Sequence, residues 1–504
     1  PSARSKIFLQ EFDQALETID NFISGKPGLY FEALAGIELS KIYRQLPYYG
    51  FRRDGKIFYN QEDREGEYVY LWHENFDKSV ELRESARLKL IAVIRDPGKC
   101  IAGTDDYRLT AIQNNLDLAE LLMSTNNVYD GYPPAEDIVP PKQDETYLPE
   151  WHPRKKILFL FDEAVAFNSG RADKHVEAQS KFKKALFLMT FPESPSKEWL
   201  KETDELRKKY ESDAAKDKPP FKQPVFAPSP DIDPLVIIES IIRDYPGDPD
   251  TDLYFGTIGR IFEARQDFVE AVAKYEEFLK KFPKSKYVPD VKLSLQGIKA
   301  PSMSFSAQTV TYKGQKPAIG INARNLSKIR FSLCEIDLED LLLRSANLND
   351  PTVSFTYFEK NFGKLKGAKN RCKKTIKKWT EEIEDAGDFQ YLNKNSELQI
   401  GEIGAYLLHA EAENIEQVQL IIHTDVIAVG KQDRGKMHYI LTDAKTGAPV
   451  GNFPVTMKEI YWQSGWWSHE KVRIKHDKTD EKGRVTFTFT TGDNIYSNRV
   501  EFFA

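Results

Sequence analysis

Residues 442–450 read Thr-Asp-Ala-Lys-Thr-Gly-Ala-Pro-Val, and residues 479–485 read Thr-Asp-Glu-Lys-Gly-Arg-Val. In each stretch an Asp precedes a Gly by a few residues. The runs on either side are rich in β-branched side chains or alternate between apolar and polar residues. An Asp at such a position accepts backbone hydrogen bonds, and the Gly supplies the positive φ of a tight turn. We therefore predict hairpin turns here and assign a structural role in the turn, and no catalytic role, to four residues: Asp443, Gly447, Asp480 and Gly483.

The sequence around these turns, from Pro301 onward, is made of short runs typical of β-strands. Examples are 328–336, 405–409 and 417–429, and Gly, Pro or Asn residues separate such runs. Short strands at this spacing favour antiparallel β-sandwiches.

The sequence before Pro301 has helical periodicity. Apolar positions recur at helical spacing from Lys6 to Leu46, and further helices are expected at 76–94, 108–124, 155–167 and 173–190. An aromatic stretch with several glycines at 48–72 reads instead as a β-ribbon or a long loop.

The clearest helical signal lies between Asp252 and Pro283, and it resembles a tetratricopeptide repeat. Small residues let the two helices approach closely, aromatic rings fill the space between them, and a proline ends the second helix. Phe278 departs from the pattern, because a small residue is usual there. Ordinary core helices without a binding groove would show the same amphipathic stripes. The predicted packing residues are Phe255, Gly259, Phe262, Ala271, Tyr275 and Pro283.

Together these patterns predict an α+β multidomain chain, in which an α-helical repeat region precedes antiparallel β-sandwich domains. The predicted parts are 1–230, helical, with a β-ribbon or loop near 48–72 and a Pro-rich linker at 218–231; 231–299, tetratricopeptide-like helical pairs; 300–425, a β-sandwich with a helical basic insert at 358–383; and 426–504, a second β-sandwich that we expect to continue beyond the chain end.

The β half also resembles a known family. The stretch 301–336, then Trp379, then Gly-Ala-Tyr-Leu-Leu-His-Ala at 404–410, is similar to the first sandwich of bacterial alpha-2-macroglobulins, and 424–429 and the two turn motifs extend the likeness. Residues 1–230 contribute little to it. The resemblance implies macroglobulin-like, Ig-like sandwiches and a non-catalytic role in envelope defence against proteases. It also implies protein partners, either proteases or envelope components, and a location in the periplasm or at the cell surface.

Macroglobulins of the trapping kind carry a thioester made within a Cys-x-Glu-Gln run, and this chain has none. Its three cysteines show no Cys-x-x-Cys pair, so the sequence predicts no zinc site and no disulfide framework, although one disulfide could form. They are Cys100, Cys334 and Cys372.

Several short motifs match ligand-binding or catalytic patterns only in part. Gly430 to Lys436 resembles a phosphate loop, but Met437 stands where Ser or Thr should bind magnesium. Ser180 to Lys183 and Lys445 to Gly447 match two motifs of penicillin-recognising enzymes, but no Ser-Asp-Asn run accompanies them and the second is explained as a turn. The alternating Asp248, Asp250 and Asp252 lack the Gly and Glu of a calcium loop, and helix capping at Asp250 or Thr251 explains them better. Neither His73-Glu74 nor His469-Glu470 continues to a zinc-protease motif. We expect no cofactor and no metal.

Composition and charge limit the classes of partner that this chain is expected to bind. Lys and Arg number 71 against 77 Asp and Glu, and a net charge of -6 argues against nucleic acid. No apolar run is long enough for a transmembrane segment. The Lys-rich stretch 364–378 is a solvated surface or a polyanion site. An aromatic cluster around Gly465 is either packed internally or a candidate partner contact, and it comprises Trp462, Trp466 and Trp467.

Two alternatives stay open. The same domains could form a structural or adaptor scaffold of an envelope complex that traps no protease. An unrecognised glycan hydrolase would use paired carboxylates from Asp162, Glu163 or Glu177. We further expect a secretion signal before Pro1 and additional β domains after Ala504, because an open-edged terminal strand invites pairing with other chains.

Overall fold

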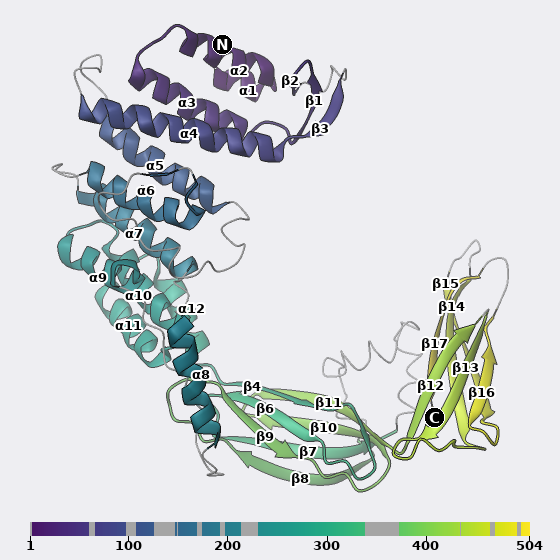
Figure 1. The fold of residues 1–504 in the computed structure, drawn as a ribbon. Helices are drawn as coiled ribbons and strands as arrows, with labels where there is room; N and C mark the ends of the chain where they lie inside the picture. The colour runs from purple at the N-terminus through teal and green to yellow at the C-terminus, as the bar shows by residue number, and fades with distance from the viewer. Residues whose placement is uncertain are drawn as a thin grey trace. The chain divides into compact units, whose positions relative to one another are not determined.

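The computed structural model describes residues 3–59, 66–96, 107–124, 147–148, 150–168, 174–191, 197–212, 230–337, 372–433, 435–463, 469–490 and 495–503. The chain divides into two compact units, Pro1–Leu293 and Ser294–Ala504. The first is mainly helical and the second contains β-sheets, as the labels of Figure 1 show.

The helices of the first unit follow the predicted periodicity, and helix α8 was not predicted. Pro234 opens α9 behind Asp233, whose side chain accepts a hydrogen bond of 2.8 Å from the Leu235 N–H. The helices are α1 Ala3–Phe8, α2 Phe12–Ser24, α3 Leu29–Tyr43, α4 Trp72–Arg95, α5 Tyr107–Met123, α6 Pro153–Phe167, α7 Lys174–Thr190, α8 Lys197–Ser212, α9 Pro234–Asp244, α10 Thr251–Ala264, α11 Phe268–Lys281 and, across the unit boundary, α12 Val288–Lys299, with a 3₁₀ turn at Pro230–Ile232.

Consecutive helices in this unit bury apolar stripes against each other. Residues of α5, α6 and α7 share one core that includes Leu118, Phe161 and Phe187, and α7, α9 and α10 share another around Tyr254. Most of the predicted Pro-rich linker at 218–231 lies outside the described residues.

The aromatic stretch after α3 forms a small antiparallel sheet of strand order β2-β1-β3. Its strands are β1 Tyr49–Arg53, β2 Lys56–Phe58 and β3 Glu67–Tyr70. One face packs on the helices, because Ile57 and Val69 join the core of α2 and α3. The β-ribbon alternative predicted for this stretch is therefore the correct one.

The first β unit spans Ser302–Thr424 and contains two sheets, of order β5-β11-β10-β7-β8 and β4-β6-β9. Both contribute to one core, which contains Phe305 of β4, Ile321 of β6, Phe331 of β7 and Leu408 of β10. One edge departs from the antiparallel prediction, since β5 pairs with β11 in parallel. The strands are β4 Ser302–Ala307, β5 Val310–Tyr312, β6 Ala318–Arg324, β7 Lys328–Ile336, β8 Lys374–Glu382, β9 Leu392–Glu397, β10 Gly404–Ala412 and β11 Ile415–Thr424.

The second β unit spans Val426–Phe503 and has two three-stranded sheets, of order β12-β13-β16 and β15-β14-β17. Leu441 and Phe487 of the first sheet share a core with Met457 of the second, and Phe502 packs against it. The strands are β12 Val426–Asp433, β13 Lys436–Asp443, β14 Pro454–Gln463, β15 His469–Lys478, β16 Arg484–Thr488 and β17 Ile495–Phe503. The chain is thus an α+β protein, while the tetratricopeptide and Ig-like classes stay predictions.

The predicted helical insert at 358–383 is wrong over its described part. Residues 374–382 form strand β8, which pairs antiparallel with β7, and residues 358–371 lie outside the described residues. Trp379 explains the difference, because its ring stacks on that of Phe331 with centroids 5.2 Å apart. Tertiary pairing and aromatic packing here override the helical tendency of a Lys-rich segment.

Candidate functional site

The predicted helix-pair packing residues come together between α10 and α11. Gly259 is buried, and a Cβ placed there would lie 2.4 Å from Cε1 of Tyr275. Tyr275 is itself buried and donates a hydrogen bond of 2.6 Å to Glu263, while Ala271 is fully buried beside it. Only a glycine therefore allows the Tyr275 ring to lie flat against α10.

The remaining residues of this set lie around the same contact. Phe255 packs beside Phe282, with centroids 5.3 Å apart, and Phe262 is partly buried against the neighbouring core. Pro283 follows the end of α11. Sequence reasoning missed how Phe278 fits: it is fully buried, and its ring lies 3.5 Å from the place where Gly256 would carry a Cβ. That separation is an ordinary van der Waals contact, so the large ring packs against α10 at Gly256 without a clash.

The first turn lies where the sequence predicts it, but β13 and β14 on either side of it belong to different sheets, so an isolated antiparallel bridge closes it. Asp443 accepts hydrogen bonds from the backbone N–H groups of Lys445, at 3.1 Å, and Thr446, at 2.7 Å, and Gly447 has a φ of +71°. A hydrogen bond from the Thr446 hydroxyl, followed by those backbone bonds, lowers the pKa of Asp443. These contacts use the carboxylate to hold the turn.

The second turn has the same chemistry and a different topology from the predicted hairpin. Asp480 accepts from the N–H groups of Lys482 and Arg484, and Gly483 has a φ of +74°. The strands that it joins, β15 and β16, belong to different sheets. The turn therefore carries the chain from one sheet to the other.

The tryptophan cluster cannot be assembled from the described residues. Trp462 lies on β14, opposite Glu470 in the register with β15. Trp466 and Trp467 lie outside the described residues. Their role as a partner contact stays a prediction.

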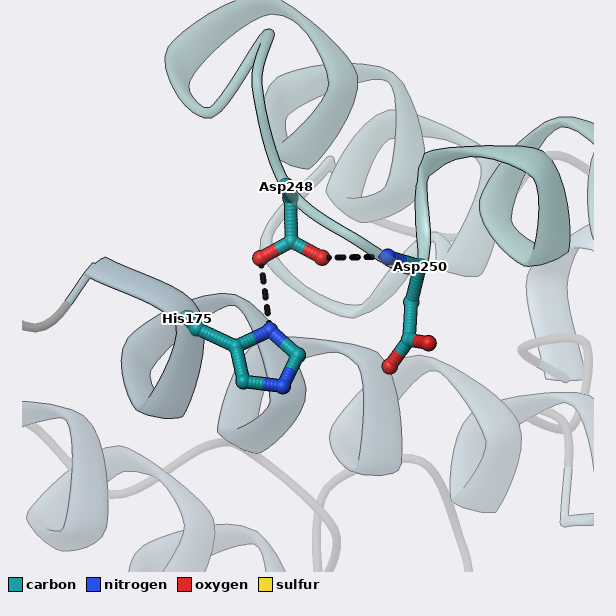
Figure 2. Close-up of side chains that lie close together, drawn as sticks. All are labelled: His175, Asp248 and Asp250. Carbon is teal, nitrogen blue, oxygen red and sulfur yellow. Dashed lines mark hydrogen bonds and ion pairs between the residues drawn. The ribbon is translucent and has the colours of Figure 1, made fainter.

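A cluster of possible metal ligands connects α7 to the turn before α10. One ligand atom from each of His175, Asp248 and Asp250 lies within 4.8 Å of the others (Figure 2). Nδ1 of His175 is 2.9 Å from a carboxylate oxygen of Asp248, and Nε2 of the ring is 2.9 Å from the Gln179 amide nitrogen. Both ring nitrogens therefore already have hydrogen-bonding neighbours.

Asp248 is the centre of this cluster and is nearly fully buried. Its other oxygen accepts from the Asp250 N–H, at 2.9 Å, and from the Tyr254 hydroxyl, at 3.0 Å. Burial and this carboxylate raise the pKa of Tyr254. Because both carboxylate oxygens of Asp248 have hydrogen-bonding partners from other segments, the arrangement acts as a hydrogen-bonded clamp between helices.

The helix-capping prediction for these aspartates is right in position and wrong in detail. Helix α10 begins at Thr251 with Asp250 as its N-cap residue, but the Asp250 side chain makes no capping hydrogen bond. Asp248 instead holds the turn through the Asp250 N–H, and nothing in this geometry forms a calcium loop. Sequence reasoning missed this clamp, because its histidine lies far from the aspartates along the chain and no local motif connects them.

The carboxylates proposed for glycan hydrolysis point to separate partners. Glu163 receives two hydrogen bonds of 2.6 Å from Arg87 and another of 2.8 Å from Asn115. Asp162 pairs with Lys184 at 2.7 Å. Burial opposes ionisation of Glu177, but hydrogen bonds from Tyr245 and Lys181 lower its pKa. Each carboxylate thus faces a basic partner of its own, Arg87, Lys184 or Lys181.

The stretch that resembles a phosphate loop forms a hairpin. Gly430 to Lys436 joins β12 to β13, with Asp433 opposite Lys436, so a hairpin stands where a phosphate loop needs a helix. The structure also contains one disulfide, between Cys334 and Cys372, with Cα atoms 5.6 Å apart, whereas Cys100 lies outside the described residues. None of the described helices combines the length and the apolar character needed to cross a bilayer.

No protein-family model matches the sequence, and no curated protein matches it significantly. Structural neighbours are fragments of bacterial alpha-2-macroglobulins. Native Escherichia coli alpha-2-macroglobulin spanning domains MG0-NIE-MG1 aligns over 40% of this chain and 63% of that one, at 10% identity and a TM-score of 0.25. The fragment spanning NIE-MG1 aligns over 41% and 97%, at 10% identity and 0.23.

The Salmonella alpha-2-macroglobulin reacted with methylamine aligns over 40% of this chain and 16% of that chain, at 14% identity and a TM-score of 0.17. The aligned region therefore spans less than two thirds of the first neighbour and a small part of the longer one. These values show similarity to parts of such proteins and carry no conclusion on activity or partners.

Proposed function

We propose that the chain is a non-catalytic envelope protein, the amino-terminal part of a bacterial alpha-2-macroglobulin-like protease inhibitor or trap. The observation that carries the proposal is the order of parts: a helical unit, then two β units of paired sheets, with the Asp443 and Asp480 turns in the second. The sequence resemblance quoted above rests on these same β residues.

The disulfide supports the location given in this proposal. Cys334 of β7 is buried and bonded to Cys372 just before β8. Stable disulfides form in oxidising compartments such as the periplasm and cell surface, and are rare in a reducing cytosol. An envelope location is therefore the one that suits this bond.

The test compares this 504-residue chain with the protein isolated from its source. Each is incubated with trypsin, with and without prior methylamine, and adducts are sought on denaturing gels. We expect no adduct and no casein cleavage by this chain, and a methylamine-sensitive adduct with the isolated protein. Casein cleavage by this chain would overturn the non-catalytic role, and an isolated protein that neither binds nor inhibits trypsin would overturn the trap.

An apolar groove in the helical unit favours the second candidate, an adaptor in an envelope complex. The groove has a volume of about 870 Å³ and lies between α2, α3 and α5, with Phe22, Phe31 and Leu109 partly exposed along it. Exposed apolar grooves of this kind mark protein or ligand contacts. If the isolated protein binds no protease but retains a stoichiometric envelope partner that Phe22→Asp releases, the adaptor becomes the function.

A further inference from the structure

The outward face of the β2-β1-β3 sheet carries an aromatic platform that neither the turns nor the helix packing explains. The register places Tyr49 opposite Tyr70, and Phe51 between Tyr68 and Phe58. Side chains alternate along a strand, so these five project from the same face. We name the set Tyr49, Phe51, Phe58, Tyr68 and Tyr70 the aromatic platform.

The platform is exposed while the opposite face is packed. Tyr49, Tyr68 and Tyr70 are 50%, 62% and 54% exposed. On the inner face Gly50 is buried, and a Cβ there would lie 2.8 Å from Leu71. The sheet thus packs one face on the core and presents aromatic rings on the other. Ordinary surfaces expose apolar residues singly, so a cluster of exposed rings marks a candidate contact surface.

The rings already pack against one another, so the surface is preorganised. The ring centroids of Tyr49 and Tyr68 are 5.4 Å apart with planes 2° apart, and Tyr49 and Tyr70 are 5.3 Å apart. Phe51 lies 5.4 Å from Tyr68. Rings that hold each other in place lose little conformational entropy when a ligand stacks on them.

The charge at one end of the platform is positive. Arg53 lies 4.7 Å above the Phe58 ring and is opposite Lys56 in the register. The three strands place no carboxylate on this face, and Asp54 lies in the turn between β1 and β2. The platform therefore complements a ligand that is flat, amphipathic and anionic.

We propose that the aromatic platform binds an acidic glycan. The apolar C–H faces of sugar rings stack on aromatic rings, and sugar hydroxyls can bond to the phenol groups of Tyr49, Tyr68 and Tyr70. Among the described residues these phenols have ring contacts and no hydrogen bond. Arg53 and Lys56 then meet the sugar carboxylates or phosphates.

Binding is measured by calorimetry on the full chain, with an oligogalacturonate as probe and a neutral maltooligosaccharide of equal length beside it. We expect saturable binding that favours oligogalacturonate. Tyr49→Ala and Tyr68→Ala should each weaken it about tenfold, the order expected for losing one stacked ring. Arg53→Gln should weaken oligogalacturonate and leave the neutral sugar unchanged.

Matched controls separate stacking from folding. Tyr312→Ala removes another exposed tyrosine, 44% exposed on β5, and should change nothing. Tyr68→Leu keeps an apolar side chain without a ring and should bind as weakly as Tyr68→Ala, with an unchanged circular dichroism spectrum. The proposal is overturned by absent saturable binding, by platform variants that bind normally, or by tighter binding of polyglutamate or oligothymidylate. Because it needs no protease contact, it stands or falls independently of the trap.

Discussion

The helices α4 to α6 and the turns of the second β unit use polar contacts of different range along the chain. Arg87 of α4 forms a buried, two-point ion pair with Glu163 of α6, whereas Asp443 bonds only to the next few residues of its own turn. Side-chain exposures of 6% and 15% show that the Arg87–Glu163 pair is largely removed from water. Long-range polar pairs therefore specify how helices meet, and short-range turns specify where strands end.

Glu163→Ala should produce the largest loss of stability. It leaves the Arg87 guanidinium buried against the rings of Tyr147 and Phe159 without its counter-charge. Removing one partner of a buried pair costs about 3–5 kcal/mol. Hydrogen–deuterium exchange of α4 and α6 peptides measures the local loss.

The matched double variant Arg87→Met with Glu163→Leu should regain most of that stability, because no unpaired charge remains. Equal exchange in Glu163→Ala and the wild type would show that the pair does not hold these helices together.

Removing the Cys334–Cys372 disulfide should have the next largest effect, and it should be confined to the first β unit. The two cysteines are 38 residues apart, and opening a loop of that size costs about 2–4 kcal/mol. The double variant Cys334→Ala/Cys372→Ala should lower the urea concentration at which β7 and β8 unfold. Hydrogen–deuterium exchange of peptides from these strands measures that midpoint. Cys100→Ala serves as the control, and an equal shift in that variant would contradict the assignment of the effect to the bond.

Gly259→Ala tests the long-range contact in the α10–α11 pair. Alanine normally stabilises a helix interior relative to glycine, but here its Cβ would meet the buried Tyr275 ring. We expect a net loss of about 1–3 kcal/mol, as for other overpacked cores. Gly297→Ala in α12 is the control, since nothing lies within 4 Å of its Cβ, and it should stabilise slightly. A stabilised Gly259→Ala variant would refute the close approach.

Gly447→Val should have the smallest effect and tests the short-range contact. Space is open around Gly447, so the cost comes from its φ of +71° alone, about 1–2 kcal/mol. Gly447→Asn, which tolerates positive φ, should lose much less. Thermal unfolding of the second β unit distinguishes them, and equal midpoints for both variants would mean that the turn does not need this conformation.

The predictions that succeeded depend on residues close in sequence. Strand and helix positions follow from periodicity, and the Asp443 and Asp480 turns follow from an Asp and a Gly a few residues apart. The failures lie where a distant residue decides. Lys374 to Glu382 lies in a stretch rich in charged residues that we predicted as a helix, yet pairing with β7 and packing on Phe331 make it a strand.

The candidate sites divide in the same way. The aromatic stretch at 48–72 was visible in the sequence, but its role was not, because only strand register shows that the rings share one exposed face. The His175–Asp248 contact joins residues 73 positions apart, and no local pattern announces it. The pairing of Cys334 with Cys372 was likewise open among three cysteines.

The sequence by itself determined the α+β composition, the change from helical to strand periodicity near Pro301, and the turns around Gly447 and Gly483, since these depend on local backbone preferences and side-chain spacing. Only the tertiary structure decided that Glu163 pairs with Arg87, that the Tyr275 ring packs on Gly259, and that β8 is a strand. Such contacts join segments far apart along the chain, and their free energy depends on burial and mutual geometry that exist only after the segments have packed.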